Sequence, residues 1–344
     1  MSRVFEALCA HLKTHPEAEV QDAVKFLYQA SFGGGHFLSD PDGAYLYLLK
    51  EAEIASLDAP YTEALGEQYA RINLSALQEL SPKTLFAMFK ASSEDTSTDK
   101  TAFLSLLDEL ENADLFDKSE NAAFLKSYRA AGCPAVHHSE AYRRAYHPAY
   151  RVVKKAYADF LPAFIAIDKL TAEKAPVTVA IDGLCGSGKT TFAALLQSVY
   201  DCNLFHADDF YLPMSMRTPE RYATPGGNVY WERILSDILE QIPKNESFSY
   251  RVFDCGVMDL GDAVQVTPKT LNILEGSYST HPELIGRYDL KIFLKTSPET
   301  QSARILKRNG PARHKMFVEK WIPLENLYFT SYPVEKQCDL VFTT

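Results

Sequence analysis

The stretch VTVAIDGLCGSGKTT, from Val177 to Thr191, decides how the second half of this chain folds. Its first five residues are mostly apolar and β-branched, a composition typical of a buried parallel strand. Gly183 to Thr190 then matches the pattern G-x-x-x-x-G-K-[ST] without a mismatch, and residues 192–200 have a helical composition with no helix breaker. A strand, a glycine-rich loop and a helix in this order predict a phosphate-binding loop.

The residue types of this loop suit phosphate chemistry. Its glycines allow the backbone to turn tightly, so that successive N–H groups point into one concavity. The helix that begins at Gly188 adds the positive end of its dipole. We expect Lys189 to reach the β- and γ-phosphates and the Thr190 hydroxyl to bind Mg²⁺. The sequence therefore predicts a nucleotide site formed by Gly183, Gly186, Ser187, Gly188, Lys189, Thr190 and Thr191.

Length and composition limit the class of protein. With 344 residues, the chain is long enough for two domains that each bury a core. The net charge of -10 argues against nucleic acid as the main partner. Residues 1–20 lack the features of a signal peptide, and no apolar stretch reaches the roughly 18 residues of a membrane span. The six cysteines are scattered without a C-x-x-C pair, which favours reduced thiols in a cytoplasmic protein.

Hydrophobic periodicity predicts a mainly α-helical N-terminal domain over residues 1–170. We expect its helices over residues 20–30, 44–57, 82–89, 101–110, 121–131 and 150–168, and one short strand over 69–74. The last of these helices would be a connection to the second domain. A polar segment at 171–176, closed by a proline, marks the expected domain boundary.

The second domain, residues 176–344, alternates strand and helix patterns. After the phosphate loop we expect strands over 203–207, 249–253, 270–274 and 290–294, and helices over 229–242, 298–307 and 321–329. This alternation implies a parallel sheet with right-handed crossovers. The predicted fold class is therefore α/β, a P-loop NTPase parallel sheet with helices on both faces, preceded by the mainly α-helical domain.

Acidic residues follow two of these predicted strands. Asp208 and Asp209 come directly after the strand over 203–207, and Glu275 follows the strand over 270–274. Because ligands gather at the carboxyl ends of parallel strands, we expect Asp208 to act as a general base and metal ligand, and Glu275 to hold Mg²⁺. Asp209 would share the water shell of the metal or be solvated. A helix cap or a turn is the structural alternative for Asp208 and Glu275.

Two segments of the N-terminal half differ from ordinary helix sequence. They are FGGGHF at 32–37 and VHHSEAYRRAYHPAYR at 136–151. They contain side chains that can bind metals: His36, His137, His138, Glu140 and His147. Because no pair has the spacing H-x-x-x-H on a predicted helix, glycine capping and tyrosine packing explain most of both segments. A contact with an anion or substrate, and a metal or catalytic role, are the alternatives.

Several motifs together resemble the uridine kinase and phosphoribulokinase type of P-loop kinases, a group that includes pantothenate and nicotinamide riboside kinases. The motifs are D-G-x-x-G-S-G-K-T-T at 182–191, D-D-F-Y at 208–211, L-E-G at 274–276, R-I-L-K-R at 304–308 and W-I-P-L-E-N-L-Y at 321–328. The resemblance covers about residues 176–344. In the N-terminal half, F-G-G-G-H and H-S-E-x-Y-R resemble an extension found in a bacterial subgroup of uridine-kinase-like proteins.

The resemblance implies roles for individual residues. Asp208 would be the general base, and Lys189 and Arg308 would stabilise the transferring phosphoryl group. The resemblance would place Tyr211 and Asp254 at the substrate site, and we add Tyr278 to this site as a further candidate that the resemblance does not imply. The lid over the phosphates would carry the basic residues Lys307, Arg308 and Arg313, of which the last would also contact the nucleotide.

These observations predict a phosphotransferase that uses ATP and Mg²⁺ and has an alcohol group of a small molecule as acceptor. Uridine or cytidine is the leading acceptor, and nicotinamide riboside and pantothenate are alternatives. The second class is a nucleotide-driven switch or ATPase with the N-terminal domain as effector. The D-D-F-Y carboxylates favour the kinase, because a switch needs no base for a hydroxyl. The choice between ATP and GTP, and between a monomer and a homo-oligomer, stays open at this point.

Overall fold

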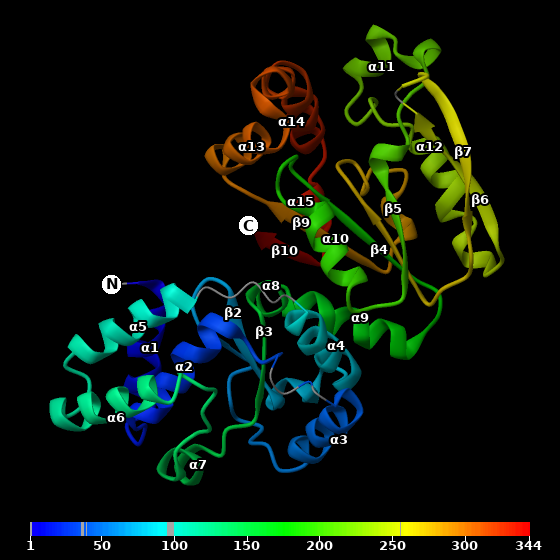
Figure 1. Cartoon of the computed structure of the whole chain (residues 1–344). Coiled ribbons are helices and arrows are strands. Elements are labelled where there is room, and N and C mark those ends of the chain that lie inside the picture. The colour runs from blue at the N-terminus through cyan, green and yellow to red at the C-terminus, as the bar shows by residue number, and fades with distance from the viewer. Residues whose placement is uncertain (1, 36–37, 39, 95–99, 255) are drawn as a thin grey trace. The chain divides into compact units, whose positions relative to one another are not determined.

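The computed structural model of the chain describes residues 2–35, 38, 40–94, 100–254 and 256–344 (Figure 1). The chain forms two compact units, residues 1–161 and 162–344. The chain divides after Leu161, the first residue of helix α9 (Leu161–Glu173), and the expected linker at 171–176 contains the end of this helix. None of the helices in the described part of the chain combines the length and the hydrophobicity that a membrane span requires.

The N-terminal unit is mainly helical, as predicted, and also contains a small antiparallel sheet. Its helices are α1 (Arg3–Thr14), α2 (Val20–Phe32), α3 (Pro41–Ala52), α4 (Pro82–Ser93), α5 (Lys100–Asn112), α6 (Lys118–Ala130), α7 (Glu140–Tyr146) and α8 (Lys155–Asp159). Its strands, in the order β1-β2-β3, are β1 (Thr62–Ala64), β2 (Tyr69–Asn73) and β3 (Tyr150–Lys154). The predicted helices between residues 20 and 131 correspond to α2 to α6, and the predicted strand is β2.

The prediction of a single helix over 150–168 is wrong. The first part of this range is β3, which pairs with β2 so that Val153 lies opposite Ala70, and α8 and α9 follow. Val152 and Val153 are both buried. β-Branched residues favour a strand where a pairing partner is available. That partner comes from a distant part of the chain, which local periodicity cannot show.

Helices α1, α2, α5 and α6 contribute to one apolar core, and the glycines after α2 are packed against it. Gly33 ends α2 with a φ of +65°. A Cβ on Gly33 would lie 2.8 Å from the ring of Tyr69, and one on Gly34 would lie 2.8 Å from the ring of Phe89. The glycines of the F-G-G-G-H segment therefore provide a helix cap and close packing. His36 lies outside the described residues.

The C-terminal unit contains a five-stranded parallel sheet in the order β10-β9-β4-β8-β5. The strands are β4 (Val177–Gly183), β5 (Cys202–His206), β8 (Leu271–Glu275), β9 (Leu290–Lys295) and β10 (Leu340–Thr343). Every residue of the central strand β4 is buried. A parallel sheet with the phosphate loop after its central strand is a P-loop NTPase fold, which confirms the predicted fold class.

Helices cover both faces of this sheet. On one face, α10 (Lys189–Gln197) contacts β4, β5 and β8. On the other face, α12 (Trp231–Arg233) continues into a π-helical turn (Ile234–Leu239), which packs with Ala180 and Leu274 in one apolar cluster. Alternate residues of a strand face opposite sides, so one strand serves both layers. The other helices of the described chain here are α11 (Pro219–Ala223), α13 (Pro298–Met316), α14 (Ile322–Ser331) and α15 (Val334–Gln337).

The strand expected over 249–253 forms, but it is not part of the parallel sheet. β6 (Phe248–Asp254) pairs antiparallel with β7 (Asp259–Val266) in a separate hairpin, yellow in Figure 1. Most side chains of β7 are exposed, whereas strands of a parallel sheet are buried on both faces. The prediction also missed β10 at the carboxyl end of the sequence.

Candidate functional site

The phosphate-binding loop lies between the carboxyl end of β4 and the start of α10. Three of its glycines have a positive φ: Gly183 (+143°), Gly186 (+72°) and Gly188 (+93°). A Cβ on Gly183 would lie 2.0 Å from the carbonyl oxygen of Leu294 in β9, so only glycine fits there. Gly188 is the N-cap of α10, so the loop receives the first amides and the positive dipole end of this helix.

Lys189 is the first residue of α10, and its buried side chain turns back onto the loop. Its Nζ donates hydrogen bonds to the carbonyl oxygens of Gly183 at 2.8 Å and Leu184 at 3.0 Å, and to the Ser277 hydroxyl at 3.1 Å. These acceptors are uncharged. A phosphate group in the loop would therefore compete well for the same donors.

A pair of oxygen atoms beside the loop fits a magnesium ion. Thr190 Oγ1 donates to Glu275 Oε1 at 3.1 Å, and His206 Nδ1 lies 2.6 Å from the same oxygen. The hydrogen bond with Glu275 raises the pKa of His206, against the opposing effect of burial. Mg²⁺ prefers hard oxygen donors and is usually held by one or two protein oxygens together with phosphate oxygens and water. Thr190 and Glu275 are such donors.

Asp208 and Asp209 form a short 3₁₀ turn directly after β5. Desolvation by the surrounding protein raises the pKa of Asp208; Glu275 adds to this shift and Lys189 opposes it. Desolvation also raises the pKa of Asp209. The Asp208 side chain is exposed, so the desolvation is that of a crowded, open site. A carboxylate in a desolvated site that is still open to solvent is the kind of group that can take a proton from a bound hydroxyl.

A cavity of about 180 Å³ joins these groups. The predicted site residues that line it are Gly186, Gly188, Lys189, Thr190, Thr191, Asp208, Tyr211, Glu275, Tyr278 and Arg308. They come from the phosphate loop, from the turns after β5 and β8, and from α13. Of the predicted residues, the fold thus places the phosphate loop, the carboxylates of Asp208 and Glu275, and Arg308 around one space.

Six predicted residues are not part of the lining of this cavity: Gly183, Ser187, Asp209, Asp254, Lys307 and Arg313. Gly183 and Ser187 are buried within the loop, and the Ser187 hydroxyl has no hydrogen-bond partner in the described part of the chain. Asp254 is exposed at the end of β6, where its carboxylate accepts the N–H of Gly256 at 2.6 Å. Arg313 is exposed on the second part of α13. The structure does not bring Asp254 or Arg313 to the other site residues.

Glu325 in α14 contacts the loop and was not predicted. Its buried carboxylate accepts the Cys185 N–H at 2.9 Å and the Ser277 hydroxyl at 2.6 Å. Because Lys189 donates to Ser277, hydrogen bonds run from the loop lysine to α14. Glu325 and Tyr328 are three residues apart, so they lie on the same face of α14, and both are buried. A charged residue is rarely buried without a partner, so a glutamate on the apolar face of a predicted helix was the signal that could have indicated this contact.

Asp182, the first residue of the loop motif, joins the loop to the segment after β8. Its buried carboxylate accepts the N–H groups of Gly183 at 2.7 Å, Tyr278 at 3.1 Å and Thr280 at 3.0 Å, and the Thr280 hydroxyl at 2.6 Å. Tyr278 has a positive φ of +74°. The network therefore fixes this unusual backbone conformation and places the tyrosine at the cavity.

The histidines of the segment 136–151 do not form a metal site. His138 Nδ1 lies 2.8 Å from Asp22 Oδ1, and its Nε2 lies 2.7 Å from the Tyr150 hydroxyl, so both ring nitrogens are engaged. Burial lowers the pKa of His138 to about 4. The described residues contain no group of three or more His, Cys, Asp and Glu side chains that could hold a metal ion. The remaining described candidates of this segment are exposed: His137, Glu140 and His147.

The sequence matches no protein-family model and no curated protein. Among solved structures, the chain is similar to a possible uridine kinase from Bacillus stearothermophilus, with 20% identity and a TM-score of 0.38 over 52% of this chain and 97% of that chain. It is similar to a candidate fructose transport system kinase from Silicibacter sp. TM1040, with 18% identity and a TM-score of 0.40 over 52% and 98%. It is also similar to a shikimate kinase from Bacteroides thetaiotaomicron, with 14% identity and a TM-score of 0.27 over 48% and 85%.

Proposed function

We propose that the C-terminal unit is a phosphotransferase that uses ATP and Mg²⁺ and acts on a hydroxyl of a small molecule. One observation carries this proposal: a single cavity is lined by the phosphate loop, by the Thr190–Glu275 pair and by a further carboxylate, Asp208, whose pKa is raised. Phosphoryl transfer to a hydroxyl uses all three parts, whereas nucleotide binding alone has no use for the base.

Each group of residues would have a separate role in the reaction. Lys189 and the loop amides would bind the β- and γ-phosphates once Nζ exchanges the loop carbonyls for phosphate oxygens. Thr190 and Glu275 would hold Mg²⁺, which would supply positive charge to neutralise the phosphates. Asp208 would accept the proton of the acceptor hydroxyl, and Arg308 would stabilise charge on the transferring group.

The site must widen before it can hold both substrates. The cavity of about 180 Å³ is smaller than the roughly 300–1,000 Å³ of typical ligand pockets. One side of it is formed by Arg308, Phe317 and Trp321, from α13 and the π-helical turn that follows. Gly310, with a φ of +75°, interrupts α13 between Arg308 and Phe317. We therefore place the hinge of a lid at Gly310.

A nucleoside, with uridine or cytidine first, is the acceptor that we propose. Tyr211 and Tyr278 line the cavity and offer aromatic surfaces to a flat base. Phe253 packs against Tyr211 with ring centroids 6.3 Å apart, which supports its position. Nicotinamide riboside and pantothenate also carry a suitable hydroxyl and are the alternative acceptors. The proposal places the enzyme in the cytoplasm and involves neither nucleic acid nor a membrane.

A nucleotide-driven switch or ATPase, with the N-terminal unit as effector, is the second candidate. The small cavity and the contacts of Lys189 with the loop's own carbonyls favour it, because both describe a site that changes conformation when a nucleotide binds. Such a switch would hydrolyse ATP slowly, and no acceptor would accelerate the hydrolysis.

A panel of acceptors tests the proposal. ADP release from Mg-ATP would be measured with uridine, cytidine, nicotinamide riboside, pantothenate and no acceptor. A kinase shows release that one acceptor stimulates, together with a phosphorylated product in mass spectrometry. Slow release that is equal in all five reactions would reject the kinase and favour the switch. Lys189→Met removes the loop cation in either case, so residual release in this variant reports a contaminating ATPase.

A further inference from the structure

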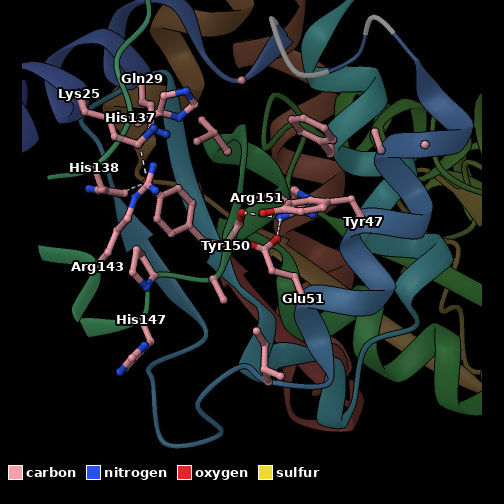
Figure 2. A pocket seen from close by; sticks show the side chains of 18 of the residues that line it. Lys25, Gln29, Tyr47, Glu51, His137, His138, Arg143, His147, Tyr150 and Arg151 are labelled. Carbon is pink, nitrogen blue, oxygen red and sulfur yellow. Dashed lines mark hydrogen bonds and ion pairs between the residues drawn. The ribbon is translucent and has the colours of Figure 1, made fainter. Parts of the chain in front are cut away.

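The N-terminal unit contains a cavity of about 840 Å³, which is within the roughly 300–1,000 Å³ of small-molecule sites (Figure 2). We call it the N-terminal cavity. Its described lining comes from α2, α3, α4, residues 137–149 and β3, so it belongs to one unit. The function proposed for the C-terminal unit uses none of these residues.

One side of the N-terminal cavity is basic. Figure 2 shows Lys25, His137, Arg143 and His147 on this side, and we call these four residues the basic wall. Lys25 comes from α2, and the other three come from the segment before α7, from α7 itself and from the residue after it, so the fold gathers them from separate parts of the sequence. Arginine, lysine and histidine are the side chains that bind phosphate groups most often.

Lys25 is the most deeply placed cation of this wall. It is 6% exposed, and its Nζ donates to the carbonyl oxygen of Val136 at 3.1 Å. Burial, together with repulsion from Arg71 and Arg143, lowers the pKa of Lys25 to about 8, and the Asp22 carboxylate opposes this shift. A buried ammonium near other cations is costly, and an anion at the wall would reduce this cost.

The opposite side of the cavity is mostly apolar, and the two charged side chains described on it neutralise each other. It includes Tyr47, Phe89 and Val152. The Arg151 guanidinium lies 5.9 Å from the centre of the Tyr47 ring and forms an ion pair with Glu51 at 2.7 Å. Figure 2 shows Tyr47, Glu51 and Arg151 together, across the cavity from the basic wall. This side offers a flat surface without net charge.

The described carboxylates of the lining do not face the basic wall. Glu51 pairs with Arg151, and Asp40 Oδ1 accepts the N–H of Gly43 at 3.1 Å at the start of α3. Arg143 lies 3.8 Å from Glu140, at the limit of an ion pair, and both side chains are exposed. Exposed ion pairs at such distances hold their charges weakly. Lys25 and Arg143 of the basic wall therefore present positive charge to the cavity.

A buried hydrogen-bond network holds this region in place. His138 links the Asp22 carboxylate to the Tyr150 hydroxyl, which donates to Gln29 at 3.2 Å. Arg71 also donates to Gln29, at 2.8 Å. Since α2, the segment before α7, β2 and β3 all join this network, the side chains around it are preorganised, which lowers the cost of binding.

We propose that the N-terminal cavity binds a phosphorylated small molecule, with its phosphate on the basic wall and its flat or apolar body against Tyr47. The volume of about 840 Å³ has room for a molecule of the size of a mononucleotide. The proposal rests on the N-terminal unit alone, so it holds whether or not the C-terminal unit is a kinase.

Binding of inorganic pyrophosphate to the full chain tests this site. Calorimetric titrations without divalent cations would compare Arg143→Gln with Arg144→Gln. Arg144 is the next residue of α7, is exposed, donates to the Glu140 carbonyl at 3.2 Å and is not part of the lining. Both variants lose one positive charge and keep the phosphate loop, so a difference between them reports on the N-terminal cavity.

We expect Arg143→Gln to weaken one binding component about tenfold, which corresponds to about 1.4 kcal/mol, and Arg144→Gln to keep the wild-type isotherm. Identical isotherms for the two variants, or no binding by the wild type, would overturn the proposal.

Pyridoxal 5′-phosphate gives a second readout that identifies the site. Its aldehyde condenses with a neutral lysine amine, water leaves, and borohydride then reduces the imine to a secondary amine. Peptide mapping is expected to find the label on Lys25, reduced by pyrophosphate and by Arg143→Gln. Pyridoxal, which lacks the phosphate, should label Lys25 about tenfold less. Equal labelling by both reagents, or an unlabelled Lys25, would contradict the proposal, and label on Lys189 reports separately on the C-terminal unit.

Discussion

Replacing Asp208 with asparagine is expected to remove catalysis and leave the C-terminal unit folded. The carboxylate lines the cavity, and desolvation together with the charge of Glu275 raises its pKa. The folded state therefore loses little when this negative charge is removed. We expect the free energy of unfolding to change by less than about 0.5 kcal/mol.

The expected loss of activity follows from the role of the residue. Without a positioned base, kcat should fall about a hundred- to ten-thousandfold. Lys189 and Thr190 stay in place, so KM for ATP should remain within about threefold of the wild-type value. Asp201→Asn is the charge-matched control, since Asp201 precedes β5, is exposed and pairs with Lys269 at 2.6 Å, whereas Asp208 follows the other end of the strand. The control should keep kcat within about threefold.

The assay is the initial rate of ADP release at saturating Mg-ATP, with the acceptor that the panel identifies. Thermal unfolding followed by circular dichroism verifies that each variant is folded. A rate for Asp208→Asn within about threefold of the wild type would refute the assignment of the base. Equal losses in Asp208→Asn and Asp201→Asn would also refute it, because they would reflect net charge alone.

Three further substitutions test other parts of the structure. Gly183→Ala would place a Cβ 2.0 Å from the carbonyl oxygen of Leu294, so the free energy of unfolding of the C-terminal unit should fall by about 2–5 kcal/mol. Gly286→Ala is the control, because a Cβ there meets nothing within 4 Å. Equal melting temperatures for the two variants would contradict the steric argument. Burial lowers the pKa of His138 from 6.5 to about 4. Between these two pH values the unfolded chain takes up a proton that the folded chain does not, so the free energy of unfolding of the N-terminal unit should fall by about 3 kcal/mol as the pH falls from 6.5 to about 4. His138→Gln should flatten this pH dependence, and an unchanged slope would contradict the role of His138. Glu325→Gln removes a negative charge beside the phosphate loop, so ADP should bind about three- to tenfold more tightly in calorimetric titrations; an unchanged affinity would show that this carboxylate does not oppose the phosphates.

The features that the sequence predicted well are those that depend on neighbouring residues. The phosphate loop could be located because its strand, its glycines and its helix are consecutive, and each conformation follows from local residue types. Asp208 and Glu275 could be placed together because the carboxyl ends of parallel strands share one edge of a sheet, and β5 and β8 are indeed neighbours. The lid was harder to place, since Arg308 reaches the cavity and Arg313, after the break at Gly310, does not.

Partners distant in sequence decided the rest. Tyr150–Lys154 form a strand because β2 offers them a pairing edge, and β6 leaves the parallel sheet because it pairs with β7. Glu325 contacts the phosphate loop through the Cys185 N–H, and the ring nitrogens of His138 contact Asp22 and Tyr150. In both cases the partner is distant in the sequence. The sequence by itself thus determined a P-loop NTPase fold and the conformation of its phosphate loop, because these depend on local residue types. Only the tertiary structure decided the lining of both cavities, because side chains far apart in the chain meet only after packing brings them together.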